Sequence, residues 1–69
     1  MIDIKSLKEE NKGKWVVYND GVRRPEVGKI KSWNDKYIFV VYKTPGKDMD
    51  SFDRYTGVAT DPEKLEWLL

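Results

Sequence analysis

Four cations and two aromatic residues form the part of this sequence whose chemistry points most clearly to binding. Cationic side chains can hold phosphate groups, and aromatic rings can stack on nucleic-acid bases. In the strand pairing expected below, the members of this group lie close together: Arg23, Arg24, Lys29, Lys31, Trp33 and Tyr42. We take them as the candidate binding surface. The alternative is an ordinary solvated face, on which lysine stems cover apolar surface.

Two further groups of residues were considered as sites. Asp48, Asp50 and Asp53 could offer oxygen ligands to a hard cation, but the remaining spacing of a calcium loop and its terminal glutamate are absent. We interpret this segment as an acidic loop and expect no metal and no cofactor. Six aromatic residues could cage a methylated amine, but in a chain of this size we expect most of them in the core: Trp15, Tyr18, Trp33, Tyr37, Tyr55 and Trp67.

Catalysis has little support in the residue types. The sequence contains no cysteine and no histidine, which excludes disulfides, thiolate chemistry, Cys/His zinc sites and imidazole acid–base catalysis. No other nucleophile–base pair is visible. We therefore expect a protein that is not an enzyme and has no catalytic residues.

Length and charge set further bounds. The 69 residues allow a single domain with a small core, in which residues 1–12 are an N-terminal helical segment and residues 13–69 a barrel. The 13 basic and 12 acidic residues nearly balance, which argues against a dominant nonspecific nucleic-acid binder but permits a local basic face. No stretch has the length and apolarity of a transmembrane helix or a signal-peptide core, so we expect a cytoplasmic protein with no membrane partner.

The N-terminal segment predicts a helix of about two turns that packs against the rest of the fold. Asp3 is a suitable N-cap, and it places Ile2 and Leu7 in the positions of a hydrophobic staple. Gly13 is the expected stop, and Ile4 and Leu7 are expected to face inward. A frayed or partner-bound N-terminus is the alternative.

Five short strands are predicted after this segment, at residues 14–18, 26–33, 36–43, within 52–60, and at 66–69. Asn19, Asp20 and Gly21 form a strong turn signal after the first strand. Asp61 followed by Pro62 predicts a one-turn helical element before the last strand. A longer C-terminal helix over residues 62–69 is the competing interpretation.

The pairing of the two central strands follows from their turn. A two-residue turn at Asn34 and Asp35 would set Trp33 opposite Lys36, whereas a three-residue turn would shift every pair by one. The two-residue turn predicts a core face composed of Gly28, Ile30, Ser32, Tyr37, Phe39 and Val41. It predicts a second face composed of Val27, Lys29, Lys31, Trp33, Ile38, Val40 and Tyr42. Two alternatives stay open for the apolar part of the second face: the Ile4 and Leu7 side of the N-terminal helix covers it, or the helix packs elsewhere and leaves an exposed apolar strip.

The segments "GKWVVYNDG", "VGKIKSWNDKYIFVVY" and "TDPEKLEWL" together resemble an SH3-like barrel, the second in the place of its central hairpin and the third in the place of its 3₁₀ turn and final strand. More loosely, "GKWVVYNDG…GKIKSW" is similar to short domains of bacterial and phage-derived genomes. The resemblance implies a mainly β, five-stranded SH3-like barrel with a short N-terminal helix. Its segments depart from the "ALYDY" stretch of proline-peptide binders, and "RRPEVGKIK" matches the KOW nucleic-acid motif only in part.

SH3-like barrels serve as peptide binders, nucleic-acid binders, methyl-lysine readers and assembly parts, so the fold does not decide the function. We expect a protein–protein accessory module, of phage or mobile-element origin, that binds an unknown protein through the candidate surface. The alternative is a nucleic-acid-binding module that uses the same basic and aromatic residues. A third possibility is a homo-oligomer that buries the apolar strip.

Overall fold

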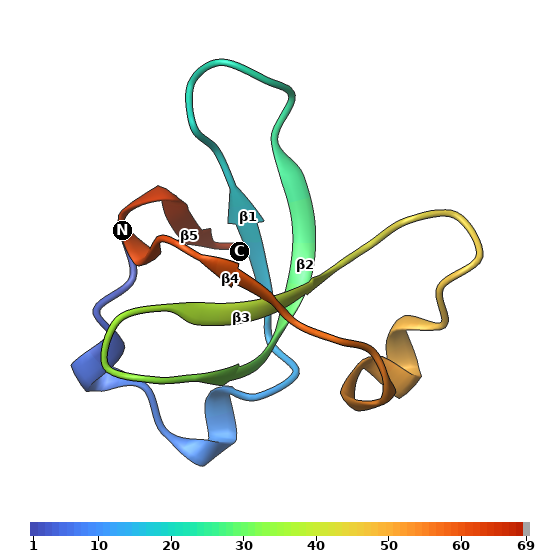
Figure 1. Ribbon diagram of the computed structural model, residues 1–69, viewed down its shortest axis with the longest axis horizontal. Helices are drawn as coiled ribbons and strands as arrows, with labels where there is room; N and C mark the ends of the chain where they lie inside the picture. The colour runs from blue at the N-terminus through green and yellow to red at the C-terminus, as the bar shows by residue number, and fades with distance from the viewer. Residues whose placement is uncertain (69) are drawn as a thin grey trace.

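The computed structural model describes residues 1–68, which form a mainly β fold with several 3₁₀ turns (Figure 1). The strands are β1 (Trp15–Tyr18), β2 (Glu26–Trp33), β3 (Ile38–Tyr42), β4 (Val58–Thr60) and β5 (Leu65–Trp67). They make one antiparallel open sheet in the order β4-β3-β2-β1-β5, so β4 and β5 form its edges. The expectation of an all-β domain with five short strands is confirmed.

The core lies on one face of this strongly bent sheet. Alternate residues of β1, β2 and β3 supply it because successive side chains of a strand point to opposite faces. N-terminal residues and β5 complete this buried cluster, whose members are Ile2, Leu7, Val16, Ile30, Ile38, Val40 and Leu65. Five of them have no exposed surface at all.

The predicted pairing of β2 with β3 is wrong. Trp33 lies opposite Ile38 rather than Lys36, and Ile30 lies opposite Val40, with a bulge between Ile30 and Ser32. The turn is longer than predicted because the side-chain oxygen of Asn34 accepts hydrogen bonds from the backbone N–H groups of Lys36 (2.8 Å) and Tyr37 (2.7 Å). The shift turns Ile38 and Val40 into the core, and no exposed apolar strip forms from them.

The other face of β3 is also covered. Val41 and Met49 are buried but lie outside the core cluster. Lys29, opposite Val41, donates a hydrogen bond to the backbone oxygen of Met49, at the start of η3 (Met49–Arg54). Residues 38–42 of the apolar run therefore form a strand that is buried or partly buried on both faces, whereas Tyr37 lies in the preceding turn and is exposed.

The N-terminal segment contains two separate 3₁₀ turns, η1 (Ile4–Ser6) and η2 (Glu9–Asn11), instead of the predicted helix. Asp3 is an N-cap as predicted, and its side chain accepts a hydrogen bond from the backbone N–H of Lys5 at 3.0 Å. Ile2 and Leu7 pack into the same cluster as Ile38 and Val40, whereas Ile4 is partly buried. Of the two alternatives for this segment, the structure shows the one in which it covers β3, and Ile2 and Leu7 do so as part of the core itself.

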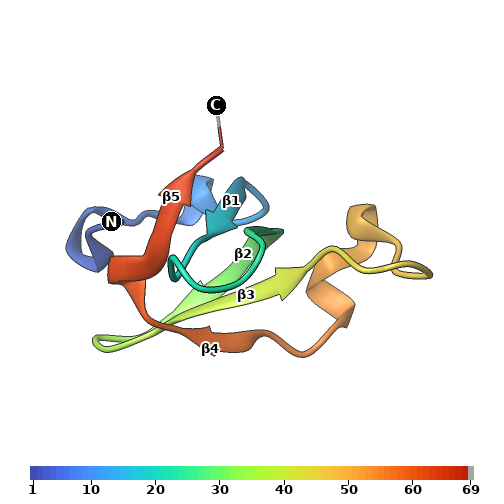
Figure 2. The same cartoon turned by 90° about the horizontal axis from the view of Figure 1, so that it is seen from above.

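The C-terminal part follows the sequence closely. Asp61 caps η4 (Pro62–Lys64), and β5 begins directly after it, so the competing long helix is wrong. The fourth strand lies within the predicted segment, at its C-terminal end, because η3 occupies the first part of that segment. The loop that carries η3 extends to one side of the sheet, and the N-terminal segment lies on the opposite side (Figure 2). Within residues 1–68, no helix has both the length and the apolarity to cross a bilayer.

Candidate functional site

The structure does not bring the six predicted site residues onto one surface. The corrected pairing separates Lys29 and Lys31 from Trp33 and Tyr42, which pack against the core cluster. Arg23 and Arg24 lie in the loop between β1 and β2 and are exposed. Only Arg23 and Tyr42 border the same cavity.

Lys29 and Lys31 hold the loop that carries η3. The ammonium of Lys29 donates to the backbone oxygen of Met49 at 3.1 Å, and that of Lys31 to the backbone oxygen of Tyr55 at 2.6 Å. The Lys29 ammonium also lies 5.0 Å from the ring centre of Trp15, within the range of a cation–π contact. Both cations thus have partners within the chain, which makes them poor candidates for phosphate contacts.

Trp33, at the C-terminal end of β2, is surrounded by other parts of the chain. Its ring packs against the core cluster, and the ammonium of Lys12 lies 5.8 Å from the ring centre. These contacts join the N-terminal segment to the sheet. The interpretation of Trp33 as a core residue fits the structure better than a role in stacking on a base.

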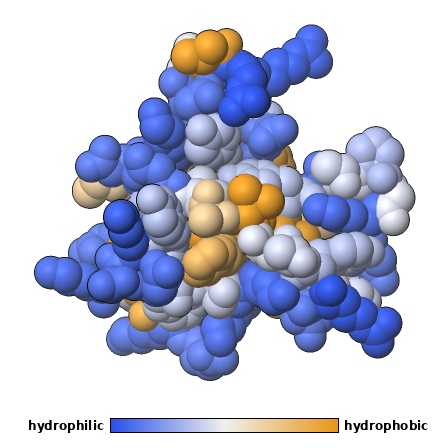
Figure 3. Space-filling model, in the orientation of Figure 1, coloured by the Kyte–Doolittle hydropathy of each residue, from blue (hydrophilic) through white to orange (hydrophobic). Residues whose placement is uncertain are grey.

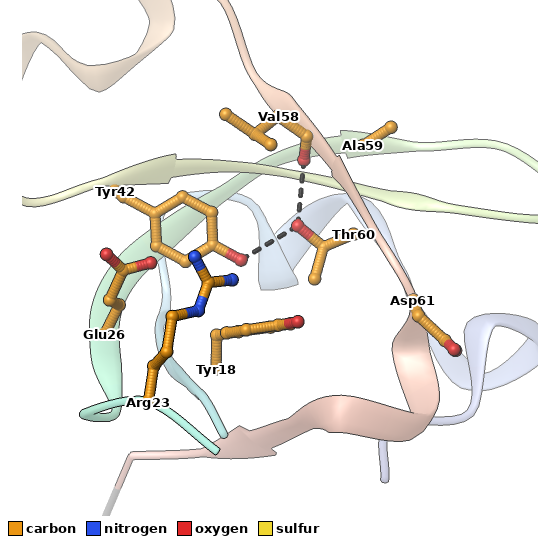
Figure 4. A pocket seen from close by; sticks show the side chains of 8 residues that line it. All are labelled: Tyr18, Arg23, Glu26, Tyr42, Val58, Ala59, Thr60 and Asp61. Carbon is orange, nitrogen blue, oxygen red and sulfur yellow. Dashed lines mark hydrogen bonds between the residues drawn. The ribbon is translucent and has the colours of Figure 1, made fainter. Parts of the chain in front are cut away.

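A cleft of about 190 Å³ opens between β4 and the β1–β2 loop (Figure 4). We call it the tyrosine cleft. Side chains of β1, β2, β3, β4 and the β1–β2 loop line it, together with the cap of η4: Tyr18, Arg23, Glu26, Tyr42, Val58, Ala59, Thr60 and Asp61.

The register of the sheet positions the two tyrosines. Tyr18 lies opposite Glu26 in the β1–β2 pair, and Tyr42 lies opposite Gly28 in the β2–β3 pair. Since residues 26 and 28 of one strand point to the same face, both rings stand on the core side of the sheet. Their centres are 6.2 Å apart and their planes meet at 81°, an edge-to-face arrangement that aromatic pairs prefer.

Hydrogen bonds fix the β4 wall of the cleft. The hydroxyl of Tyr42 lies 2.8 Å from Oγ1 of Thr60, and Thr60 Oγ1 donates to the backbone oxygen of Val58 at 3.0 Å (Figure 4). Burial raises the pKa of Tyr42 above its ordinary value of 10, and the negative charge of Glu26 adds to this shift. Tyr42 therefore remains a neutral phenol at physiological pH.

The loop over the cleft is shaped by its own side chains. The carboxylate of Asp20 accepts hydrogen bonds from the backbone N–H groups of Val22 (2.9 Å) and Arg23 (3.0 Å). These two bonds lower the pKa of Asp20 below its ordinary value. The side-chain oxygen of Asn19 likewise accepts from the backbone N–H of Gly21. The turn signal of the sequence is thus confirmed as a turn held by these hydrogen bonds, and Val22 next to it is exposed.

Arg23 reaches from this loop across the mouth of the cleft, toward the two tyrosines (Figure 4). Its side chain is 77% exposed, and its Nε lies 3.6 Å from Oδ2 of Asp20. Glu26 brings a negative charge to the lining, and the carboxylate of Asp20 lies next to Arg23, so two carboxylates neighbour the one positive charge of Arg23. The carboxylate of Asp61 points away from the tyrosines and accepts a hydrogen bond from the backbone N–H of Glu63 as the cap of η4 (Figure 4). The cleft therefore combines aromatic walls with negative charge beside Arg23.

Apolar surface continues beside the cleft. Val58 on the edge strand β4 is 53% exposed, and Figure 3 shows an apolar patch near the centre of this face, surrounded by polar surface. A second, more apolar hollow lies elsewhere, lined by Trp15, Val27, Lys43 and Leu68. Its described lining residues include one aromatic ring and no acidic side chain, so they offer less for specific recognition.

The sequence did not reveal Glu26 and Thr60 as members of a site, and it offered Tyr18 only as a possible member of an aromatic cage. Tyr18 and Glu26 could have been brought together from the predicted strand ends, because the first strand ends at Tyr18 and the second begins at Glu26, and the two residues lie opposite each other. Thr60 had no comparable signal, since its place depends on how β4 pairs with β3. The chain matches no family model, and comparison with curated proteins and with solved structures likewise finds no match. Its function is therefore inferred from the geometry of the site.

Proposed function

We propose that this protein is a non-enzymatic binding module whose tyrosine cleft receives a segment of a protein partner. The observation that carries the proposal is the nearly perpendicular pair of Tyr18 and Tyr42, which are partly buried and line the cleft. Tyrosine supplies a large, rigid contact area together with a hydroxyl, and it is enriched at protein interfaces and their hot spots. The exposed Val58 extends this contact area onto β4.

The size of the cleft favours a side chain over a larger ligand. Sites for drug-sized molecules and cofactors usually have volumes of about 300–1,000 Å³. The tyrosine cleft, at about 190 Å³, has room for one or two side chains of a partner segment. The rest of that segment would lie on the apolar surface beside the cleft.

We further propose that the sheet belongs to an SH3-like barrel. The order β4-β3-β2-β1-β5 and the 3₁₀ turn η4 directly before β5 support this proposal. Closure of the barrel and the phage or mobile-element origin remain predictions that rest on the resemblance of the sequence.

Nucleic-acid binding is the second candidate function, and the β1–β2 loop is the observation that favours it. Arg23 and Arg24 are exposed there beside Val22, which is 87% exposed. Arginine can contact phosphates, and apolar wedges can insert between base steps. This function predicts that DNA or RNA shifts the amide resonances of Arg23 and Arg24 at low salt, and that binding weakens steeply as salt rises.

A capture experiment with three forms of the full chain tests the proposed function. Val58→Lys places a charge on the rim of the cleft, at an exposed position of an edge strand that tolerates lysine. Tyr37→Ser is the control, because Tyr37 is also exposed but lies in the turn at the far end of β3. We expect the wild type and Tyr37→Ser to retain a protein from the native host, and Val58→Lys to retain at least about tenfold less of it. A tenfold loss of affinity corresponds to about 1.4 kcal/mol of binding free energy. Equal retention by all three forms would contradict the assignment of the cleft, and no retained protein would count against the function.

A further inference from the structure

We infer that the tyrosine cleft binds an arginine side chain of the partner and that Arg23 of the same chain covers this place in the free protein. The inference rests on the proposed function and names the chemistry of its ligand. Three features of the cleft carry it: its charge, its aromatic walls and the position of Arg23.

The charge of the lining favours a cation. The carboxylate of Glu26 borders the cleft, and the carboxylate of Asp20 lies beside it, next to Arg23. The carboxylate of Asp61 points away from the tyrosines, where it caps η4 (Figure 4). Arg23 is the one cation among the described lining residues. An anionic group entering the cleft would meet this negative charge, whereas a cationic group would be attracted by it.

The walls favour a flat cation in particular. A cation placed over the face of a tyrosine ring is attracted by the electron density of that face. A guanidinium is planar and less strongly hydrated than an ammonium, so it stacks on aromatic rings at a smaller cost of desolvation. Tyr18 and Tyr42, set at 81° to each other, present differently oriented ring surfaces to such a group.

Arg23 already places a guanidinium at this mouth, and its hold there is weak. The side chain is 77% exposed, and its ion pair with Asp20 is long, at 3.6 Å. Asp20 is held independently, since the backbone N–H groups of Val22 and Arg23 donate to it. The Arg23 side chain can therefore swing out, or be removed by mutation, while the bonds that shape the loop remain.

Because a ligand must first displace Arg23 from the cleft, the presence of Arg23 lowers the apparent affinity of the protein for its partner. A ligand that can enter only when the cleft is free binds with an affinity reduced by the fraction of molecules in that state. Replacing Arg23 by alanine should consequently tighten the binding of a cationic ligand. This result separates a competitor from a binding residue, because loss of a binding residue would weaken the interaction.

NMR titration of the full chain with N-acetyl-arginine N-methylamide tests the inference. The neutral analogue N-acetyl-citrulline N-methylamide is the matched control for shape, and N-acetyl-lysine N-methylamide, with its free side-chain amine, is the control for charge. We expect the arginine compound to shift the amide resonances of Tyr18, Glu26, Tyr42 and Thr60, the citrulline compound to leave them in place, and the lysine compound to bind more weakly. We expect Arg23→Ala to lower the dissociation constant at least about twofold and Glu26→Gln to raise it about two- to fivefold. Arg24 lies in the same loop but outside the cleft lining, so Arg24→Ala should leave the dissociation constant of the arginine compound unchanged.

Three results would overturn the inference: no shifts with the arginine compound, equal shifts with the citrulline compound, or weaker binding by Arg23→Ala. Retained sensitivity of partner capture to Val58→Lys together with any of them would leave the cleft as a protein-binding site with a different ligand. Capture that is insensitive to Val58→Lys would instead contradict the assignment of the cleft in the proposed function, and capture of no protein would count against the function itself. The two failures are therefore distinguishable.

Discussion

Gly28 lies directly opposite Tyr42 in the β2–β3 pair, and the strands are so close there that a side chain at position 28 has no room. A Cβ atom on Gly28 would lie 2.6 Å from Cγ1 of Val40 and 2.7 Å from the backbone oxygen of Val41. The close approach of β3 sets the ring of Tyr42 over the sheet, where it meets Tyr18. One glycine thus connects the packing of the core to the geometry of the cleft.

Gly28→Ala should destabilise the fold strongly, because one of the atoms that the new Cβ would meet is the backbone oxygen of Val41, which cannot rotate away. We expect a loss of about 3 kcal/mol or more, at the upper end of overpacking costs, measured by urea unfolding. Gly46→Ala is the control: its Cβ would have open space, but its φ of +89° is unfavourable for alanine. That control should lose about 1–2 kcal/mol. A Gly28→Ala protein no less stable than the control would contradict the close packing of β2 on β3.

The buried hydroxyl of Tyr42 predicts a specific dependence of stability on alkaline pH. Because burial raises its pKa above the ordinary value of 10 in the folded protein, the unfolded chain loses this proton first as pH rises. The contribution to stability is complete below about pH 10 and is lost as pH rises through the higher pKa of the folded state. Tyr42→Phe has no phenol at this position and therefore lacks this pH-dependent contribution. Near neutral pH its free energy of unfolding should be lower by about 0.5–1.5 kcal/mol, because the hydrogen bond to Thr60 is lost.

Urea unfolding of the wild type and Tyr42→Phe at about pH 8 and about pH 11 checks this prediction. The free-energy difference between the two proteins should shrink at the higher pH. Subtracting the variant removes the titration of the other tyrosines and of the lysines, which both proteins share. A difference that is the same at both pH values would mean that Tyr42 is not buried as described.

Lys31→Met should loosen the loop that carries η3. The ammonium of Lys31 donates to the backbone oxygen of Tyr55 at 2.6 Å, and methionine keeps the apolar stem but not the donor. We expect a loss of about 1–2 kcal/mol and faster hydrogen exchange of the amides of Ser51 and Tyr55. Lys5→Met, at an exposed N-terminal position, should change neither. Unchanged exchange in Lys31→Met would show that Lys31 is free, which would reopen its role as a phosphate contact.

The elements of the fold could be predicted where local chemistry decides them. Asp61 before Pro62 gave the one-turn element, and the signal of Asn19, Asp20 and Gly21 gave the first turn, because in each case a side chain bonds the adjacent backbone. The same chemistry at Asn34 misled the prediction. The side-chain oxygen of Asn34 accepts hydrogen bonds from two successive N–H groups, and the turn is longer as a result. The Asn34-Asp35 pair is also compatible with a two-residue turn, so the sequence did not reveal the longer one.

The candidate site could be predicted only in part, because it depends on register. One longer turn and one bulge exchanged the two faces of β3, so that Lys29 and Lys31 were separated from Tyr42. Arg23 and Tyr42 still lie together, since the β1–β2 loop, which carries Arg23, and the end of β3, which carries Tyr42, both line the cleft. A site assembled from five separate segments cannot be derived from the spacing within any one of them.

Site-specific crosslinking tests most directly the central claim that the tyrosine cleft contacts a protein partner. A photoreactive amino acid at Val58, on the rim of the cleft, is compared in the native host with the same group at Tyr37 and at Lys5, both exposed and outside the cleft lining. The account predicts one discrete crosslinked protein from position 58 that is absent from the other two positions and is lost when Tyr18 is replaced by alanine. Crosslinks that form equally from all three positions, or only from positions 37 and 5, would contradict it.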